Sequence, residues 1–185
     1  MIRFAACVLA ALFAFSSFAL ADDDDDDDDE RSHRQQDLAK LHNMLYQKNC
    51  ASCHFAYQAD LLPSRSWKAI MQPSALVKHF GDNAELAEGE RLAISAFLQA
   101  NAADVRRTRW SKKLLRGLSK HETPLRITKL SYFVRLHDEV PTRLVTGNPR
   151  VRSWSNCSAC HTEAKQGSFR EHEIDIPGDN FWDFD

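Results

Sequence analysis

The cysteines of this chain fall into two identical patterns, each made of two cysteines three positions apart and a histidine directly after the second. Two thiols at this spacing can each form a thioether with one vinyl group of a haem, and the adjacent imidazole can then bind the iron from one side. The pattern is therefore typical of a covalently attached c-type haem. The first motif consists of Cys50, Cys53 and His54, and the second of Cys157, Cys160 and His161.

Other chemistries also use closely spaced cysteines. Four thiolates can bind zinc, but the two pairs lie far apart in the sequence, and a zinc site leaves His54 and His161 unexplained. Thioredoxin-like redox motifs need a βαβ setting that this sequence does not predict, and disulfides would not require the two histidines. Two complete motifs therefore favour a protein that carries two covalently bound haems.

Each iron has a second axial position, and the residue that fills it decides the function. A second histidine gives a low-spin haem of low potential, a methionine raises the potential, and an open position permits ligand binding or peroxide chemistry. For the first motif we favour His79, which follows Leu76 on a predicted short helix. Met71 is the alternative, although its position suits a core contact better.

For the second motif we expect the second axial ligand to lie upstream in the sequence, because few residues follow His161. His137 continues the apolar stripe of a predicted helix that begins near Thr128. The alternatives are His121 in a polar segment, His172 in a predicted extended closing segment, and an open iron position. We favour His137 because an apolar helical stripe faces the interior.

Short helices are predicted to position the first motif. Apolar residues at helical spacing precede it, and Pro73 suits the first turn of a helix that stops at Gly81. Asp82 with Glu85 resembles a capping box that starts a last helix. This order of elements over residues 36–103 resembles a small class I cytochrome c. The buried stripe of the last helix is expected to consist of Ile94, Phe97 and Leu98.

Residues 104–185 form the second predicted haem region, which opens with a basic connector over residues 104–118. Leucines give this connector an apolar stripe, so we expect a surface helix. Nucleic-acid binding does not fit an exported protein, whereas docking to an acidic redox partner or pairing with haem propionates does. The sequence therefore predicts a mainly α protein with two small haem-binding, cytochrome c-like lobes.

The first 21 residues have the features of a secretory signal peptide. Arg3 supplies the positive start, a nearly continuous apolar run follows, and a small-x-small cleavage site ends at Ala21. Cleavage after Ala21 removes Cys7, so that every remaining cysteine belongs to one of the two motifs. No later apolar run is long enough to span a bilayer.

The formal net charge of −2 hides an uneven distribution of charge. Residues 22–30 are nine consecutive acids, and we expect an acidic, disordered leader over residues 22–35 because such charges repel one another. Residues 31–185 hold 23 basic and 17 acidic groups. The body is therefore basic, and its association with an acidic partner is expected to weaken as salt increases.

Together these residues resemble the bacterial dihaem cytochromes c of the DHC type. The two haem motifs alone are common to many cytochromes, so the resemblance depends on further segments spread over nearly all of the chain after the signal peptide. These segments are Arg65-Ser66-Trp67, His79-Phe80-Gly81, Asn83 to Leu86, Arg126-Ile127-Thr128, His137, Trp154 to Ala164, and Ile176-Pro177.

The resemblance implies a periplasmic electron carrier with two covalently bound, low-spin haems. By position, the implied iron ligands are His54 and His79 for one haem, and His161 and His137 for the other. Electrons would come from a membrane cytochrome b or a soluble donor and pass to another soluble cytochrome c, in some relatives a high-spin one. No enzymatic step is expected. The competing hypotheses are a small dihaem peroxidase and a haem-based ligand-binding protein, both of which need an open iron site.

Overall fold

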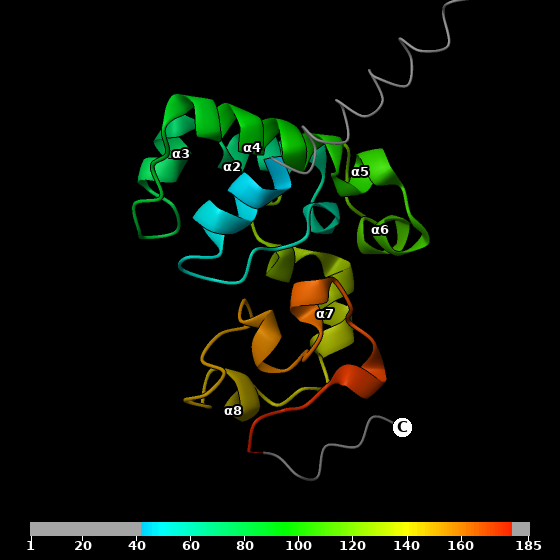
Figure 1. The fold of residues 1–185 in the computed structure, drawn as a ribbon. Helices are drawn as coiled ribbons and strands as arrows, with labels where there is room; N and C mark the ends of the chain where they lie inside the picture. Colours follow the sequence, from blue (N-terminus) through cyan, green and yellow to red (C-terminus); the bar gives the residue numbers. More distant parts are fainter. Residues whose placement is uncertain (1–41, 179–185) are drawn as a thin grey trace, which may run out of the picture. The chain divides into compact units, whose positions relative to one another are not determined.

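A computed structural model describes residues 42–178, which form a series of short helices (Figure 1). The predicted signal peptide and acidic leader lie outside these residues. Within them there is no β-strand, only two isolated bridges, His79 with Asp82 and His161 with Ile174. None of the described helices is both long and apolar enough to cross a membrane. The mainly α fold predicted from the sequence is thus confirmed.

Four elements follow the first motif, and a helical segment precedes it. Residues 42–50 are helical and end at the first cysteine of the motif. Helix α2 packs against both α3 and α4, so these three helices lie together on one side of the first motif (Figure 1). The elements are η1 (Ala59–Leu61), α2 (Ser64–Ile70), α3 (Pro73–Val77) and α4 (Glu88–Ala100).

The hydrophobic core lies mainly between these helices. Ile94 and Leu98, predicted as the stripe of α4, are 0% and 1% exposed, and Phe97 packs against the core from its edge. Burying an aliphatic side chain of this size contributes about 1.5–3 kcal/mol to stability. Trp67 of α2 is also buried, and its indole N–H donates a hydrogen bond of 2.6 Å to the carbonyl of Ala59. The core therefore fixes α2 and α4 around the first motif.

Helix α3 begins at Pro73 as predicted but ends before the predicted Gly81, at Val77. Phe80 and Gly81 both have positive φ, 52° and 118°, and the N–H of Asp82 donates a hydrogen bond of 3.0 Å to the carbonyl of His79. A two-residue turn with both central residues at positive φ has this pattern. His79 is therefore presented by a tight turn after α3, and not by the helix itself.

The start of α4 also differs from the prediction. The proposed capping box of Asp82 and Glu85 does not form, because the side-chain oxygen of Asn83 accepts a hydrogen bond of 2.9 Å from the N–H of Glu85. Such a local side-chain bond stabilises a turn in place of a helix. The helix begins later, at Glu88, whose acidic side chain suits a helix N-terminus.

The basic connector over residues 104–118 is two short helices and not the predicted single one. Arg107 adopts a left-handed conformation, with φ 48°, and interrupts the chain. The side chain of Thr108 then caps the next helix by accepting a hydrogen bond from the N–H of Ser111. Both helices pack against η1, so the connector joins the core around the first motif. The two helices are α5 (Ala103–Arg106) and α6 (Arg109–Leu114).

The remaining elements surround the second motif and are shorter still. The helix that carries His137 begins at Ser131, slightly later than the predicted start near Thr128, and His137 is its last residue. The closing segment is only partly extended, because a 3₁₀ turn interrupts it before Ile174. The elements are η2 (Ile127–Lys129), α7 (Ser131–His137), α8 (Thr142–Val145), η3 (Cys157–Ala159), η4 (Ala164–Gln166) and η5 (Glu171–Glu173).

Candidate haem-binding sites

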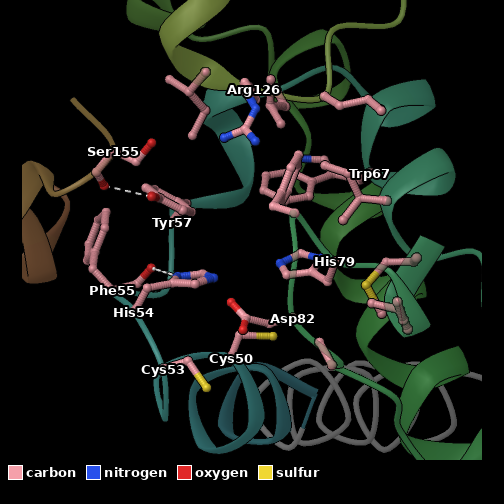
Figure 2. Close-up of a pocket in the computed structure, with 18 of the residues that line it drawn as sticks. Cys50, Cys53, His54, Phe55, Tyr57, Trp67, His79, Asp82, Arg126 and Ser155 are labelled. Carbon is pink, nitrogen blue, oxygen red and sulfur yellow. Dashed lines mark hydrogen bonds between the residues drawn. The ribbon is translucent and has the colours of Figure 1, made fainter. Parts of the chain in front are cut away.

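A cavity of about 700 Å³ lies beside the first motif (Figure 2). Cys50, Cys53 and His54 line it, together with His79 from the turn after α3. Its walls also include buried apolar side chains of α2, α3 and α4, and its volume falls within the range of about 300–1,000 Å³ typical of cofactor sites. The first motif therefore opens onto a space suited to a large, mainly apolar group.

The rings of His54 and His79 face each other across this cavity (Figure 2). Their centroids are 6.1 Å apart, and their planes differ by only 17°. Two imidazoles that bind one metal ion from opposite sides, each through a nitrogen at about 2 Å, have ring centroids about 6 Å apart. The spacing of this pair therefore fits two axial ligands of a single iron.

A hydrogen bond of His54 and the partial burial of His79 also suit iron binding. The Nδ1 atom of His54 lies 2.7 Å from the carbonyl oxygen of Phe55, and because a carbonyl can only accept, Nδ1 carries the proton. The lone pair is then on Nε2, the nitrogen that a haem-linked histidine offers to iron. Burial, with a further contribution from nearby His54, lowers the pKa of His79 and favours its neutral form.

Met71, the alternative ligand to His79, lines the same cavity but belongs to the hydrophobic core. Its side chain is 3% exposed and is grouped there with Trp67 and Ile70. Its carbonyl oxygen accepts a hydrogen bond of 2.8 Å from the guanidinium of Arg91 on α4, which fixes its backbone. The structure thus places Met71 as a packing residue and sets the ring of His79 opposite His54.

The second motif has an equivalent histidine pair. The ring centroids of His137 and His161 are again 6.1 Å apart, but the planes are nearly perpendicular, at 73°. The Nδ1 atom of His137 lies 2.8 Å from the carbonyl oxygen of Phe133 on the same helix, which leaves Nε2 with the lone pair. Burial lowers the pKa of both histidines. The pair therefore has the same ring spacing as the first pair but a different angle between its planes.

Aromatic side chains surround this second pair. The ring of Phe133 stacks on His137 at 4.0 Å, Trp154 meets His137 edge-on at 5.9 Å, and Phe169 meets His161 edge-on at 5.4 Å. The Nδ1 atom of His161 is buried without a hydrogen-bond partner among the described residues. His161 therefore lacks the contact between Nδ1 and a backbone carbonyl that His54 and His137 make.

The other candidate ligands lie at the surface. His121 is exposed in the segment before η2, and the side chain of His172 is 74% exposed, with its Nε2 3.9 Å from a carboxylate oxygen of Glu173. The ring that lies 6.1 Å from His161 is that of His137. Residues 42–178 therefore pair each motif histidine with the residue that the sequence favoured.

The cysteines of both motifs form no disulfide among the described residues, which argues against one of the alternative chemistries. Burial raises the pKa of Cys50 and of Cys157 to about 11, so both thiols are neutral near pH 7. Within the described part of the chain, no cluster of three or more histidine, cysteine or acidic residues has the arrangement of a metal site. Four uncommitted thiols beside paired histidines fit thioether attachment of haem.

The two sites touch each other, which the sequence did not reveal. Cys157 of the second motif lines the first cavity. The hydroxyl of Tyr57 donates a hydrogen bond of 2.7 Å to the carbonyl of Ser155 (Figure 2). The amide of Gln58 donates one of the same length to the carbonyl of Ala164. The segment after the first motif is thus hydrogen-bonded to the chain both before and after the second motif.

Arg126 also lines the first cavity, although it comes from the segment before η2. In the sequence, Arg126 stands out only as part of the Arg126-Ile127-Thr128 segment of the family resemblance. Arg126 lies between the apolar residues Leu125 and Ile127, but Leu125 is itself exposed, so the local sequence gives no signal that Arg126 lines a cavity.

Comparison with known proteins agrees with this geometry. The chain is similar to a solved diheme cytochrome type c from Shewanella baltica, with 39% identity, a TM-score of 0.62, and coverage of 77% of this chain and 98% of that one. It is also similar to a diheme cytochrome c from Rhodobacter sphaeroides, with 47% identity, a TM-score of 0.60, and coverage of 68% and 94%. No curated protein sequence matched the chain. Residues 46–169 match the family described as dihaem cytochrome c, and the chain is a member of that family.

Proposed function

We propose that this protein is an electron carrier that holds one c-type haem at each of its two motifs. A c-type haem supplies a one-electron couple between ferric and ferrous iron. The observation that carries the proposal is the pairing of histidine rings, since both pairs have centroids 6.1 Å apart. Two pairs at the spacing of axial ligands support two irons that are each bound on both sides.

In this proposal the residues of each motif have separate tasks. Cys50 and Cys53 anchor the first haem through thioethers, while His54 and His79 bind its iron. The cysteines of the second motif anchor the second haem, whose iron is bound by His161 and His137. With both axial positions filled by histidine, the irons are low spin and of low potential, and no position is open for peroxide or a gaseous ligand.

The proposed organisation of the chain follows from these roles. Residues 36–103 hold the first haem and residues 104–185 the second. Residues 1–21 direct export to the periplasm and are removed after Ala21, where covalent attachment of both haems completes the protein. The acidic leader over residues 22–35 affects docking and leaves the iron ligands untouched.

The proposed partners are other redox proteins. A membrane cytochrome b or a soluble donor supplies electrons, and another soluble cytochrome c receives them. The exposed basic residues of α5 and α6, including Arg106, Arg109 and Lys112, support a partner with an acidic docking face. Charge complementarity of this kind increases the association rate, and added salt reduces it.

The experiment that tests the proposal is spectroscopy of the exported, haem-loaded chain. The mass is expected to show loss of 21 residues and addition of two haems. Absorption and electron paramagnetic resonance spectra of the oxidised protein are expected to contain low-spin signals only. A high-spin signal from either iron would contradict the electron-carrier proposal and would support the peroxidase or ligand-binding alternative, both of which need an open site.

A further inference from the structure

We infer that Arg126 binds the propionate groups of the first haem, so that a residue from the second half of the chain sets the reduction potential of the haem held by the first half. The inference rests on the proposed function, because it assumes a haem between His54 and His79. It adds a carboxylate-binding site to that cavity and assigns it to one side chain.

The position of Arg126 matches the chemistry of a c-type haem. The vinyl groups, which the cysteines bind, and the two propionates lie on opposite edges of the porphyrin ring. Cys50 and Cys53 lie at one end of the first cavity, and Arg126 points into it from the other end (Figure 2). Attachment of the haem to the cysteines therefore directs its carboxylates toward the guanidinium.

Arg126 is the only lysine or arginine among the described residues that line this cavity. Its guanidinium has no ion-pair or side-chain hydrogen-bond partner within residues 42–178, and its recorded contact is with the ring of Phe80, 4.2 Å from the guanidinium carbon. Stacking on an aromatic face holds a guanidinium in place and leaves its N–H groups free. Those donors form a planar fork that matches a carboxylate.

The other strong donors at this end of the cavity are already used. The hydroxyl of Tyr57 donates to the carbonyl of Ser155 (Figure 2). The indole N–H of Trp67 donates to the carbonyl of Ala59. An ionised carboxylate beside these largely apolar walls needs a charged partner to offset its lost hydration. Arg126 is the side chain that is both charged and free to provide it.

The contact between Arg126 and Phe80 also reaches the iron ligand. Phe80 follows His79 in the turn after α3, and the two rings meet edge-on at 4.8 Å. A cation at this position disfavours the ferric state, which carries one more positive charge than the ferrous state, and therefore raises the potential. Removing the cation is expected to lower the potential of the first haem.

The test compares the reduction potentials of the haem-loaded wild-type chain with those of Arg126→Gln, Arg126→Lys and Lys129→Gln. Arg126→Gln is expected to shift the reduction equilibrium of the first haem about tenfold toward the oxidised form, which is about 59 mV for a one-electron couple. Arg126→Lys keeps the charge but loses the fork, so it should retain most of the wild-type potential. Lys129→Gln removes one exposed charge three residues away, outside the cavity lining, and should leave both potentials unchanged.

The two haems are assigned with His79→Met, which raises the potential of the haem that His79 binds. Unchanged potentials in Arg126→Gln would overturn the inference, as would an equal fall in Lys129→Gln or a larger shift at the second haem. If Arg126→Gln fails to retain the first haem, Arg126→Lys is measured in its place. A small fall in potential confined to the first haem is then expected, and an equal change at the second haem would overturn the inference. Failure of the proposed function can be distinguished from failure of this inference. A wild-type chain that lacks two low-spin haems would contradict the proposed function before any variant is measured.

Discussion

The hydroxyl of Tyr57 donates a hydrogen bond of 2.7 Å to the carbonyl of Ser155, a residue 98 positions away in the chain. Tyr57 lies three residues after the iron-binding position of the first motif, and its ring centroid is 5.2 Å from that of His54. Ser155 lies two residues before Cys157. A single side chain therefore joins the surroundings of both haem sites.

Replacing Tyr57 with phenylalanine tests this connection. The change keeps the ring beside His54 but removes the hydroxyl, so the free energy of unfolding is expected to fall by about 1 kcal/mol. Chemical denaturation of the haem-loaded chain measures it. Tyr132→Phe is the matched control, because that hydroxyl has no hydrogen-bond partner recorded within residues 42–178, and it should cost little. Equal stability of Tyr57→Phe and the wild type would show that the bond contributes nothing.

Alanine at His79 and at His137 tests the ligand assignment one haem at a time. Each substitution opens one iron position, so half of the iron is expected to become high spin while the other half stays low spin. Absorption and electron paramagnetic resonance spectra of the oxidised protein report this directly. His121→Ala, His172→Ala and Met71→Leu serve as controls that should leave both irons low spin. A fully low-spin spectrum in His137→Ala would transfer the ligand role to another residue.

The angle between the histidine planes predicts different spectra for the two haems. The planes of His54 and His79 are nearly parallel, 17° apart, so both rings interact with the same one of two iron d orbitals that would otherwise be equal in energy. This interaction separates the energies of the two orbitals. Nearly perpendicular rings, 73° apart as for His137 and His161, act on both orbitals alike and leave them close in energy. Low-temperature electron paramagnetic resonance should therefore show one ordinary rhombic signal and one highly anisotropic signal with a single large g value. Two matching rhombic signals would contradict the perpendicular arrangement.

Gly81 is expected to be needed for the turn that presents His79. Its φ is 118°, a conformation that L-residues rarely adopt, although no atom would block an added Cβ. Gly81→Ala should therefore destabilise the protein by about 1–3 kcal/mol through backbone strain alone. Denaturant unfolding measures the loss, and the spin state of the first haem reports displacement of His79.

The control for this substitution is Gly89→Ala in α4. Gly89 also has free space around its Cα but lies within the helix and has no positive φ, so alanine there should stabilise the protein by about 0.4–1 kcal/mol. The two substitutions add the same methyl group and are expected to have opposite effects. A stabilising Gly81→Ala would show that the turn does not constrain the chain.

The sequence alone predicted the local features of both sites. The spacing of cysteines and histidines defines the motifs, and the apolar stripe of α4 and the start of α3 at Pro73 follow from residue type and periodicity. These features depend on neighbours within a few positions, which a sequence displays directly.

The features that the sequence did not predict depend on backbone geometry or on distant residues. Phe80 adopts a left-handed backbone conformation before Gly81 and turns the chain, whereas the periodicity of apolar residues predicted a helix as far as Gly81. Arg107 also adopts a left-handed conformation and divides the connector, whereas its leucines predicted a single helix. The bond between Tyr57 and Ser155 has no local signal at all, because neither residue is unusual among its neighbours. Positive φ at residues other than glycine is uncommon, so composition gives little warning of it.

The wall of the first cavity has a consequence for the biosynthesis of the protein. The first motif and its paired histidine lie between Cys50 and His79, whereas Arg126, Ser155 and Cys157 complete the wall of the cavity. A ribosome adding about 5–20 residues per second needs on the order of ten seconds to pass from the first motif to the second. The nascent chain therefore displays the first motif well before the residues that enclose its cavity exist, and a chain truncated before Arg126 would keep the motif and its histidine pair but leave the pocket open on one side.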